Sequence, residues 1–157
     1  MAGLAGAVNW KRALAATLVE QAVREARSDR HRRQALLEGA VFELALAYRF
    51  YLGELAEALQ LPEAEGIADL AQLEGLCRRR GIVSPEVAEL AALEQAADSW
   101  LAALLAARRR IAEPPRPASP DLLAGGGPPW LDCAEVAGWR AAFDALVERQ
   151  RAGLVEW

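Results

Sequence analysis

The single histidine of the chain, His31, limits the nucleophilic and metal-based chemistry that this sequence can support. A catalytic triad or a histidine-containing metal site would have to include it. The two cysteines, Cys77 and Cys133, lie far apart in the chain and supply neither a zinc cluster nor a disulfide framework. A di-iron site of the helical-bundle type needs two Glu-x-x-His motifs, which one histidine cannot provide. We therefore assign no catalytic, cofactor-binding or metal-ligating residue and expect no cofactor.

Two other groups of residues have chemical types that suit a site. Glu38 lies at the margin of an apolar stripe, where a carboxylate is structural if an arginine pairs with it and a candidate acid or base if it stands unpaired in a cavity. Four aromatic residues could line a pocket for a small molecule between helices: Tyr48, Tyr51, Trp100 and Trp139. Aromatic residues at helical spacing more often form core, so a packed core is the alternative.

Helices must position these residues, because apolar side chains recur at helical spacing along most of the chain. Ser84-Pro85-Glu86 is the strongest start signal, and Gly81 is placed to end the helix before it. We expect an all-α fold, an antiparallel bundle of four long helices and one short helix in a single domain over residues 1–157. The expected helices cover about 4–27, 29–59, 67–79, 85–111 and 134–152, and a loop rich in proline and glycine at 113–129 precedes the last one.

The first two helices carry the most informative apolar patterns. The stripe of the first is Val8, Trp10, Leu14, Leu18, Ala22 and Ala26. In the second, one core stripe contains Leu37, Val41, Leu44, Tyr48, Leu52, Leu55 and Leu59, and the opposite side is apolar too, with Phe42, Leu46, Phe50 and Gly53 in line. A helix that is apolar nearly all round must be covered nearly all round. Either it lies at the centre of the monomer, or Phe42, Leu46, Phe50 and Gly53 form the interface of a homodimer.

The overall charge argues against two classes of partner. The 157 residues carry a net charge of −4, which disfavours bulk attraction to nucleic acid or to an anionic membrane. The charge is unevenly distributed, with seven basic and three acidic residues in 1–33 but one basic and eight acidic residues in 34–76. The longest uncharged runs are about half of a membrane span. We expect a cytoplasmic protein with no membrane partner, and the charge disfavours a nucleic-acid partner.

Two resemblances to known families bear on function. Arg24 and His31 have a spacing similar to that of the arginine and histidine that act on a phosphodiester in HEPN-type helical ribonucleases, although a predicted helix break separates them here. The alternative for this pair is a solvated, charge-rich junction between helices. More of the chain resembles small uncharacterised helical proteins of pseudomonads and related gammaproteobacteria. The resemblance rests on Asn9, residues 34–41, residues 84–87 and the Ser99-Trp-Leu-Ala-Ala-Leu-Leu segment. It implies a bacterial, cytosolic, all-helical protein and transfers no site residue.

These observations favour a protein that works through contacts. The leading prediction is a non-enzymatic helical module that self-associates or binds a protein partner through the second helix. One alternative is a small-molecule sensor with the aromatic pocket described above. The other is a HEPN-like, RNA-acting protein that uses Arg24 and His31.

Overall fold

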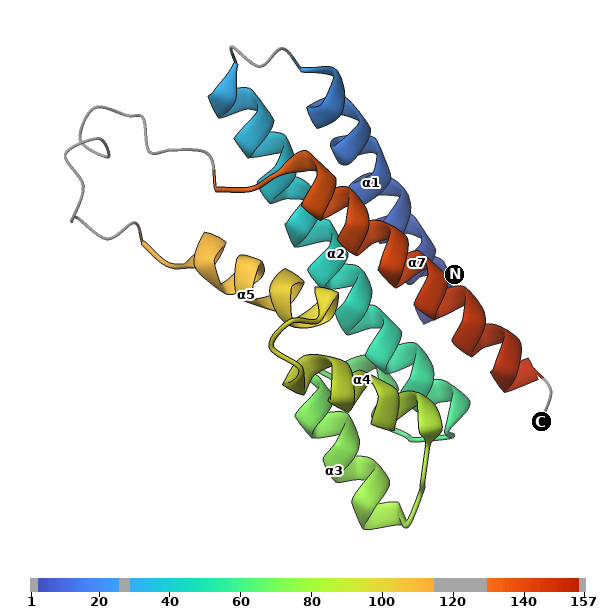
Figure 1. Cartoon of the computed structure of the whole chain (residues 1–157). Helices are drawn as coiled ribbons and strands as arrows, with labels where there is room; N and C mark the ends of the chain where they lie inside the picture. The colour runs from blue at the N-terminus through green and yellow to red at the C-terminus, as the bar shows by residue number, and fades with distance from the viewer. Residues whose placement is uncertain (1–2, 26–28, 115–129, 156–157) are drawn as a thin grey trace.

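The computed structural model describes residues 3–25, 29–114 and 130–155, and within them all regular structure is helical (Figure 1). The expectation of an all-α protein is confirmed for this part of the chain. Most of the proline- and glycine-rich segment expected to be a loop lies outside these residues. The helices are α1 (Leu4–Arg24), α2 (Arg30–Ala58), the short 3-10 helix η1 (Ala64–Gly66), α3 (Leu70–Arg80), α4 (Pro85–Gln95), α5 (Trp100–Ala112) and α7 (Cys133–Val155).

Helices α1 and α2 form an antiparallel hairpin. At one end of the hairpin, Leu4 of α1 lies against Gly53 of α2, and towards the other end Leu18 lies against Gly39. Between these two contacts, the ammonium of Lys11 lies 2.8 Å from a carboxylate oxygen of Glu43. As the residue number rises along α1, the number of its contact partner on α2 falls, so the two helices are antiparallel. The same pairs show which residues of α1 and α2 lie opposite each other.

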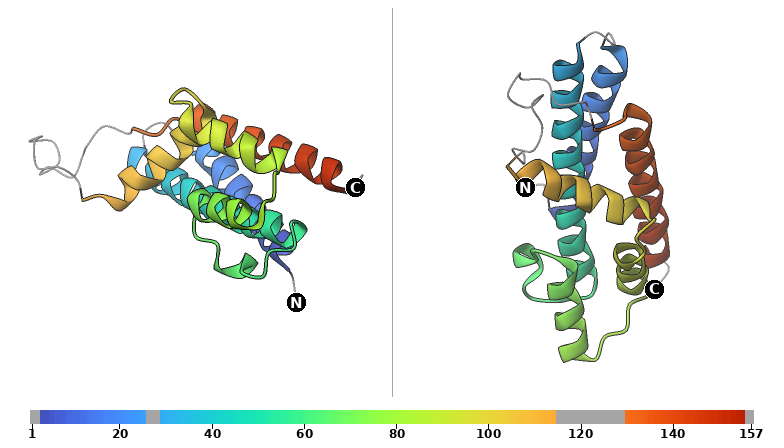
Figure 2. Two further views of the ribbon diagram at one scale, coloured as in Figure 1. Left: turned by 90° about the horizontal axis from the view of Figure 1, so that it is seen from below. Right: turned by 60° about the vertical axis from the view of Figure 1, so that its left-hand side comes forward.

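Helix α7 lies beside both helices of the hairpin, far from them in sequence (Figures 1 and 2). It runs antiparallel to α1, because Arg12 pairs with Asp144 while the earlier Asn9 accepts a hydrogen bond from the later Arg151. It runs parallel to α2, because Tyr48 meets Phe143 and Glu54, further along, pairs with Arg151. The long helices therefore do not simply alternate in direction along the chain.

The expected single helix over 85–111 is wrong, and Ser99 explains why. The chain leaves the helical conformation at Ala96, where ψ is 108°. The hydroxyl of Ser99 then accepts a hydrogen bond from the amide of Ala102 at 3.0 Å and donates one to the carbonyl of Leu93. This N-cap starts α5 in a new direction, across α2 rather than along it (Figure 2, right). Three long helices, not four, result within the described residues.

Three other expected helix ends are confirmed, whereas α3 begins at Leu70 and not at the expected residue 67. Ser84 caps α4 by accepting a hydrogen bond from the amide of Val87 at 3.3 Å. Asp29 caps α2 in the same way through the amide of Arg32, and Gly81 ends α3 in the left-handed conformation with a φ of 66°. These local signals work because each satisfies backbone groups that a helix end leaves without partners.

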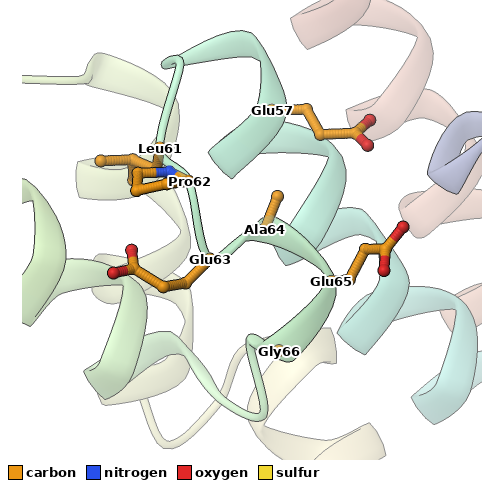
Figure 3. A pocket seen from close by; sticks show the side chains of 7 residues that line it. All are labelled: Glu57, Leu61, Pro62, Glu63, Ala64, Glu65 and Gly66. Carbon is orange, nitrogen blue, oxygen red and sulfur yellow. The ribbon is translucent and has the colours of Figure 1, made fainter.

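Between α2 and α3 the chain turns back and places η1 against α2 (Figure 3). A Cβ atom on Gly53 would lie 2.8 Å from the carbonyl oxygen of Ala64 and 3.0 Å from Cδ1 of Leu4. Only glycine allows this approach, because real Cβ atoms essentially never come so close to another heavy atom.

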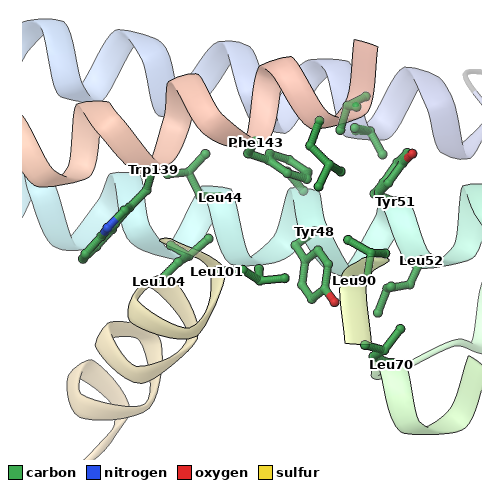
Figure 4. Close-up of a cluster of buried hydrophobic side chains, with 14 of the residues drawn as sticks. Leu44, Tyr48, Tyr51, Leu52, Leu70, Leu90, Leu101, Leu104, Trp139 and Phe143 are labelled. Atoms are coloured by element: carbon green, nitrogen blue, oxygen red, sulfur yellow. The ribbon is translucent and has the colours of Figure 1, made fainter. Parts of the chain in front are cut away.

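The core extends over all of the α-helices, and its aromatic part lies where α2, α5 and α7 meet (Figure 4). Phe143 of α7 is fully buried at its centre, and the rings of Tyr48, Tyr51 and Trp100 lie 6.4, 6.1 and 6.1 Å from it. The two tyrosines meet Phe143 edge to face, the arrangement that the aromatic quadrupole favours.

Candidate interaction surface

Phe42 is a large hydrophobic residue that the packing of α2 leaves exposed, with 41 % of its surface open to solvent. On α2, Glu43 points to α1 through its ion pair with Lys11, and Leu44 is fully buried in the core. Successive residues of a helix are separated by about 100° around its axis. Phe42 therefore lies on the other side of Glu43 from the core.

Trp10 is exposed to a greater extent, at 63 %, and it lies on the same side of the hairpin. On α1, Lys11 points to α2 and Arg12 points to α7, where it pairs with Asp144. Trp10 precedes Lys11 by one residue, so it lies about 100° from Lys11 in the direction away from α7. The expectation that Trp10 shares the buried stripe of the first helix is wrong, because the buried positions there are Val8, Ala15, Val19 and Ala22.

Trp10 and Phe42 thus flank the Lys11–Glu43 ion pair on the outside of the hairpin. Leu14 and Leu46 follow Lys11 and Glu43 by three residues, on the same side, and both are half-buried. We call these four residues, Trp10, Leu14, Phe42 and Leu46, the hairpin face. Large aromatic rings on a monomer surface, with neighbouring apolar side chains, are typical of interaction sites.

The four residues predicted for the interface fall into two pairs. Phe42 and Leu46 belong to the hairpin face. Phe50 is half-buried against the core, and Gly53 is buried beneath Ala64 and Leu4 of the same chain. The helix is therefore mostly covered within the monomer, and of the predicted line only the first half, Phe42 and Leu46, is left available. The sequence analysis placed Trp10 in the buried stripe. The spacing could have shown its exposure, because Trp10 lies on a different side of α1 from the small buried residues Ala15 and Ala22.

Arg108 of α5 lies over the Phe42 ring, with its guanidinium carbon 4.6 Å from the ring centroid. This cation–π contact holds the ring in place and leaves part of it exposed. A rigid aromatic ring loses little conformational entropy when a partner covers it, which suits a contact residue.

The two ends of the hairpin differ in charge. At the α1–α2 turn, Arg24, Arg30 and Arg32 are exposed. At the other end, η1 and the end of α2 form an open pocket of about 410 Å³ with three exposed glutamates, Glu57, Glu63 and Glu65 (Figure 3). This pocket includes Ala64, which covers Gly53, so it adjoins the line along α2 that Phe42 and Leu46 continue.

The four aromatic residues predicted to line a ligand pocket pack mainly among core side chains. Tyr48, Tyr51 and Trp139 are buried, and Trp100 is half-buried against the same cluster. Burial, followed by the nearby charge of Glu94, raises the pKa of Tyr48, which donates a hydrogen bond to that carboxylate at 2.7 Å. Burial likewise raises the pKa of Tyr51. Both phenols remain protonated and act as hydrogen-bond donors, so these contacts favour a packed aromatic core.

A polar network joins α2, α4 and α7 beside this core. Tyr51 donates to the side-chain oxygen of Gln150 at 2.7 Å, and the amide of Gln150 donates to Glu89 at 2.9 Å. Arg149 also donates to Glu89, and this hydrogen bond lowers the pKa of the carboxyl group. Gln150 is 4 % exposed and is satisfied on both sides. The network therefore has a structural role in setting the position of α4 on α7.

The remaining candidates lie on three helices, α1, α2 and α3. Glu38 is half-buried and accepts a hydrogen bond from Gln34 at 3.0 Å, an i, i+4 contact within α2. Arg24 is the last residue of α1 and His31 the second residue of α2, so the pair lies on two helices. Cys77 is buried, and burial raises the pKa of its thiol. Among the described residues, no three histidine, cysteine, aspartate or glutamate side chains gather where they could hold a metal ion.

The fold and this surface define an all-helical protein with an apolar face on its N-terminal hairpin. None of the helices in the described ranges has the length and apolar character needed to cross a membrane. Residues 8–157 match the family of unknown function DUF6586, and the chain belongs to this family. The resemblance to an uncharacterised family is thereby confirmed, and its bacterial range stays a prediction. Comparisons with curated proteins and with solved structures gave no match.

Proposed function

We propose that this protein is an interaction module that self-associates through the hairpin face. The observation that carries the proposal is the exposure of Trp10 and Phe42, two large rings that flank the Lys11–Glu43 ion pair on one side of the hairpin. Interface cores are enriched in aromatic residues and depleted in unpaired charge. The Lys11–Glu43 pair at the centre of this face is already formed within the monomer, so a partner can cover these two charges without leaving either one alone.

The dimensions of the hairpin suit a stable dimer. Helices of 21 and 29 residues are about 30 and 44 Å long at a rise of 1.5 Å per residue. The whole outer side of the hairpin, two helices or about 15–20 Å wide, is of the order of the 800 Å² per partner that standard interfaces bury, and the hairpin face is its apolar centre. Trp10 and Phe42 would contribute about 200–250 Å² of this area on each protomer, from their exposed fractions and typical ring areas.

The test is a measurement of molar mass in solution as a function of protein concentration, by sedimentation equilibrium. The wild-type chain is expected to form a dimer, and Phe42→Glu to shift the protein to monomer. Glutamate at this position can pair with Arg108, so the variant should keep its helical circular dichroism spectrum. The matched control is Val83→Glu, at a position that is 94 % exposed in the connection between α3 and α4. A wild-type monomer at high micromolar concentration, or equal dimerisation of all three proteins, would refute the proposal.

A further inference from the structure

The charge distribution along the hairpin indicates how two copies would be oriented on each other. Arg24 at the end of α1 and Arg32 at the start of α2 are exposed, and each lies 14 residues, about four helical turns, from Trp10 or Leu46 on its own helix, so both are on the side of the hairpin face. The side chain of Arg32 is 63 % exposed although it pairs with Glu25 at 3.0 Å. Glu57 lies near the end of α2, and its carboxylate points to the same side as that of Glu65, while Glu63 of the acidic pocket points the other way (Figure 3). The apolar residues Phe42 and Leu46 lie between these two charged ends.

The spacing of these three groups is nearly symmetric about the middle of α2. Residue 44 is the midpoint of Arg30–Ala58, and Phe42 and Leu46 lie on either side of it. Arg32 precedes the midpoint by 12 residues and Glu57 follows it by 13 residues. At 1.5 Å per residue, each charged end is therefore about 20 Å from the centre of the apolar group.

Building on the self-association proposed above, we infer that the occupant of the hairpin face is a second copy of this chain, bound antiparallel about a two-fold axis near residue 44. Such an axis places Arg24 and Arg32 of one copy over the acidic pocket at the end of α2 in the other. It forms this contact twice, because a two-fold interface repeats every pairing. The parallel arrangement would instead bring arginine onto arginine and glutamate onto glutamate, which like-charge repulsion disfavours.

Exposed charges at the rim of an interface act mainly on orientation and on the salt dependence of association. The antiparallel pairing therefore predicts that the wild-type dimer weakens as sodium chloride is raised from about 50 to 500 mM, as the screening length shortens. The apolar centre should hold some dimer at high salt, because burial of apolar surface does not depend on screening of charges.

A charge-exchange experiment tests the orientation. One variant carries Arg24→Glu and Arg32→Glu, and the other carries Glu57→Arg and Glu65→Arg. In an antiparallel dimer each variant repels itself at both ends, so each alone should dimerise at least about tenfold more weakly than wild type. An equimolar mixture should recover a dimer of wild-type affinity, since every contact in the heterodimer then joins opposite charges. Circular dichroism and thermal unfolding establish that both variants are folded, and Glu65→Arg alone replaces the second variant if it is not.

The outcomes separate this inference from the proposal on which it rests. Weakened variants that recover on mixing support the antiparallel pairing. A wild-type dimer whose affinity either variant leaves unchanged or strengthens, or a mixture that does not recover, overturns the pairing while self-association stands. A wild-type chain that stays monomeric at every concentration and salt overturns both, and points to a different protein as the occupant of the face.

Discussion

The contact between η1 and α2 makes a sharp prediction for Gly53→Ala. In an ordinary exposed helix, replacing glycine with alanine stabilises by about 1 kcal/mol, because alanine has less conformational freedom to lose. Here the added methyl group would lie 2.8 Å from the carbonyl oxygen of Ala64 and 3.0 Å from Leu4. The leucine side chain can rotate away, but the carbonyl oxygen can move only if the backbone of η1 shifts.

The expected magnitude follows from these two opposing effects. Overpacking of this kind costs about 1–3 kcal/mol, which exceeds the gain in helix propensity. We expect Gly53→Ala to lower the free energy of unfolding by about 1–2 kcal/mol, measured by urea denaturation. The matched control is Gly138→Ala in α7, where an added Cβ meets nothing within 4 Å and a gain of about 0.5–1 kcal/mol is expected.

An intermediate case completes the series. At Gly39 the added Cβ would lie 3.2 Å from Cδ1 of Leu18, the far end of a flexible side chain, so Gly39→Ala should fall between the other two variants. For a chain of this size, 1 kcal/mol corresponds to about 2–4 °C in Tm, so the order is measurable by thermal unfolding as well. If Gly53→Ala were as stable as Gly138→Ala, the close approach of η1 to α2 would be refuted.

Two further predictions concern the polar network beside the core. Tyr51→Phe should lower the free energy of unfolding by about 1–2 kcal/mol, because it leaves the buried side-chain oxygen of Gln150 without its hydrogen bond. Tyr48→Phe should lower the free energy of unfolding by less, since its partner Glu94 is only half-buried. Equal losses for the two variants in urea denaturation would contradict this account. The lowered pKa of Glu89 adds stability that is complete above the usual carboxyl value of 4.5 and is lost as the pH falls through the lowered pKa. Glu89→Gln should therefore reduce stability at neutral pH and approach wild type on acidification, and a difference that persists unchanged at low pH would argue against the Arg149 contact.

Most of the helical structure was predictable because its signals are local. Ser84, Gly81 and Asp29 satisfy backbone groups within three residues of themselves, so the helix ends they define need no knowledge of the rest of the chain. Ser99 carries the same kind of signal, and apolar residues on both sides of it concealed the break between α4 and α5. The identity of one buried stripe on α2, including Leu37 and Leu44, likewise followed from spacing alone.

The candidate surface needed the tertiary structure. The spacing of Phe42, Leu46, Phe50 and Gly53 predicted that α2 is apolar on two sides, but it could not say what covers the second side. That depends on where distant segments pack: Leu4 and Ala64 cover Gly53, the core covers part of Phe50, and Phe42 remains exposed beneath Arg108. Trp10 shows the same limit, because its side of α1 became an outer side only when α7 packed beside Arg12.

The sequence by itself determined that this protein is helical, where most of its helices begin and end, and that α2 has too much apolar surface for one neighbour. Periodicity and capping are properties of a few adjacent residues, so they can be found in the chain without its fold. The tertiary structure alone decided which of those apolar residues stay uncovered. Their exposure depends on contacts between segments such as Leu4 and Gly53, which are 49 residues apart in sequence and adjacent in space.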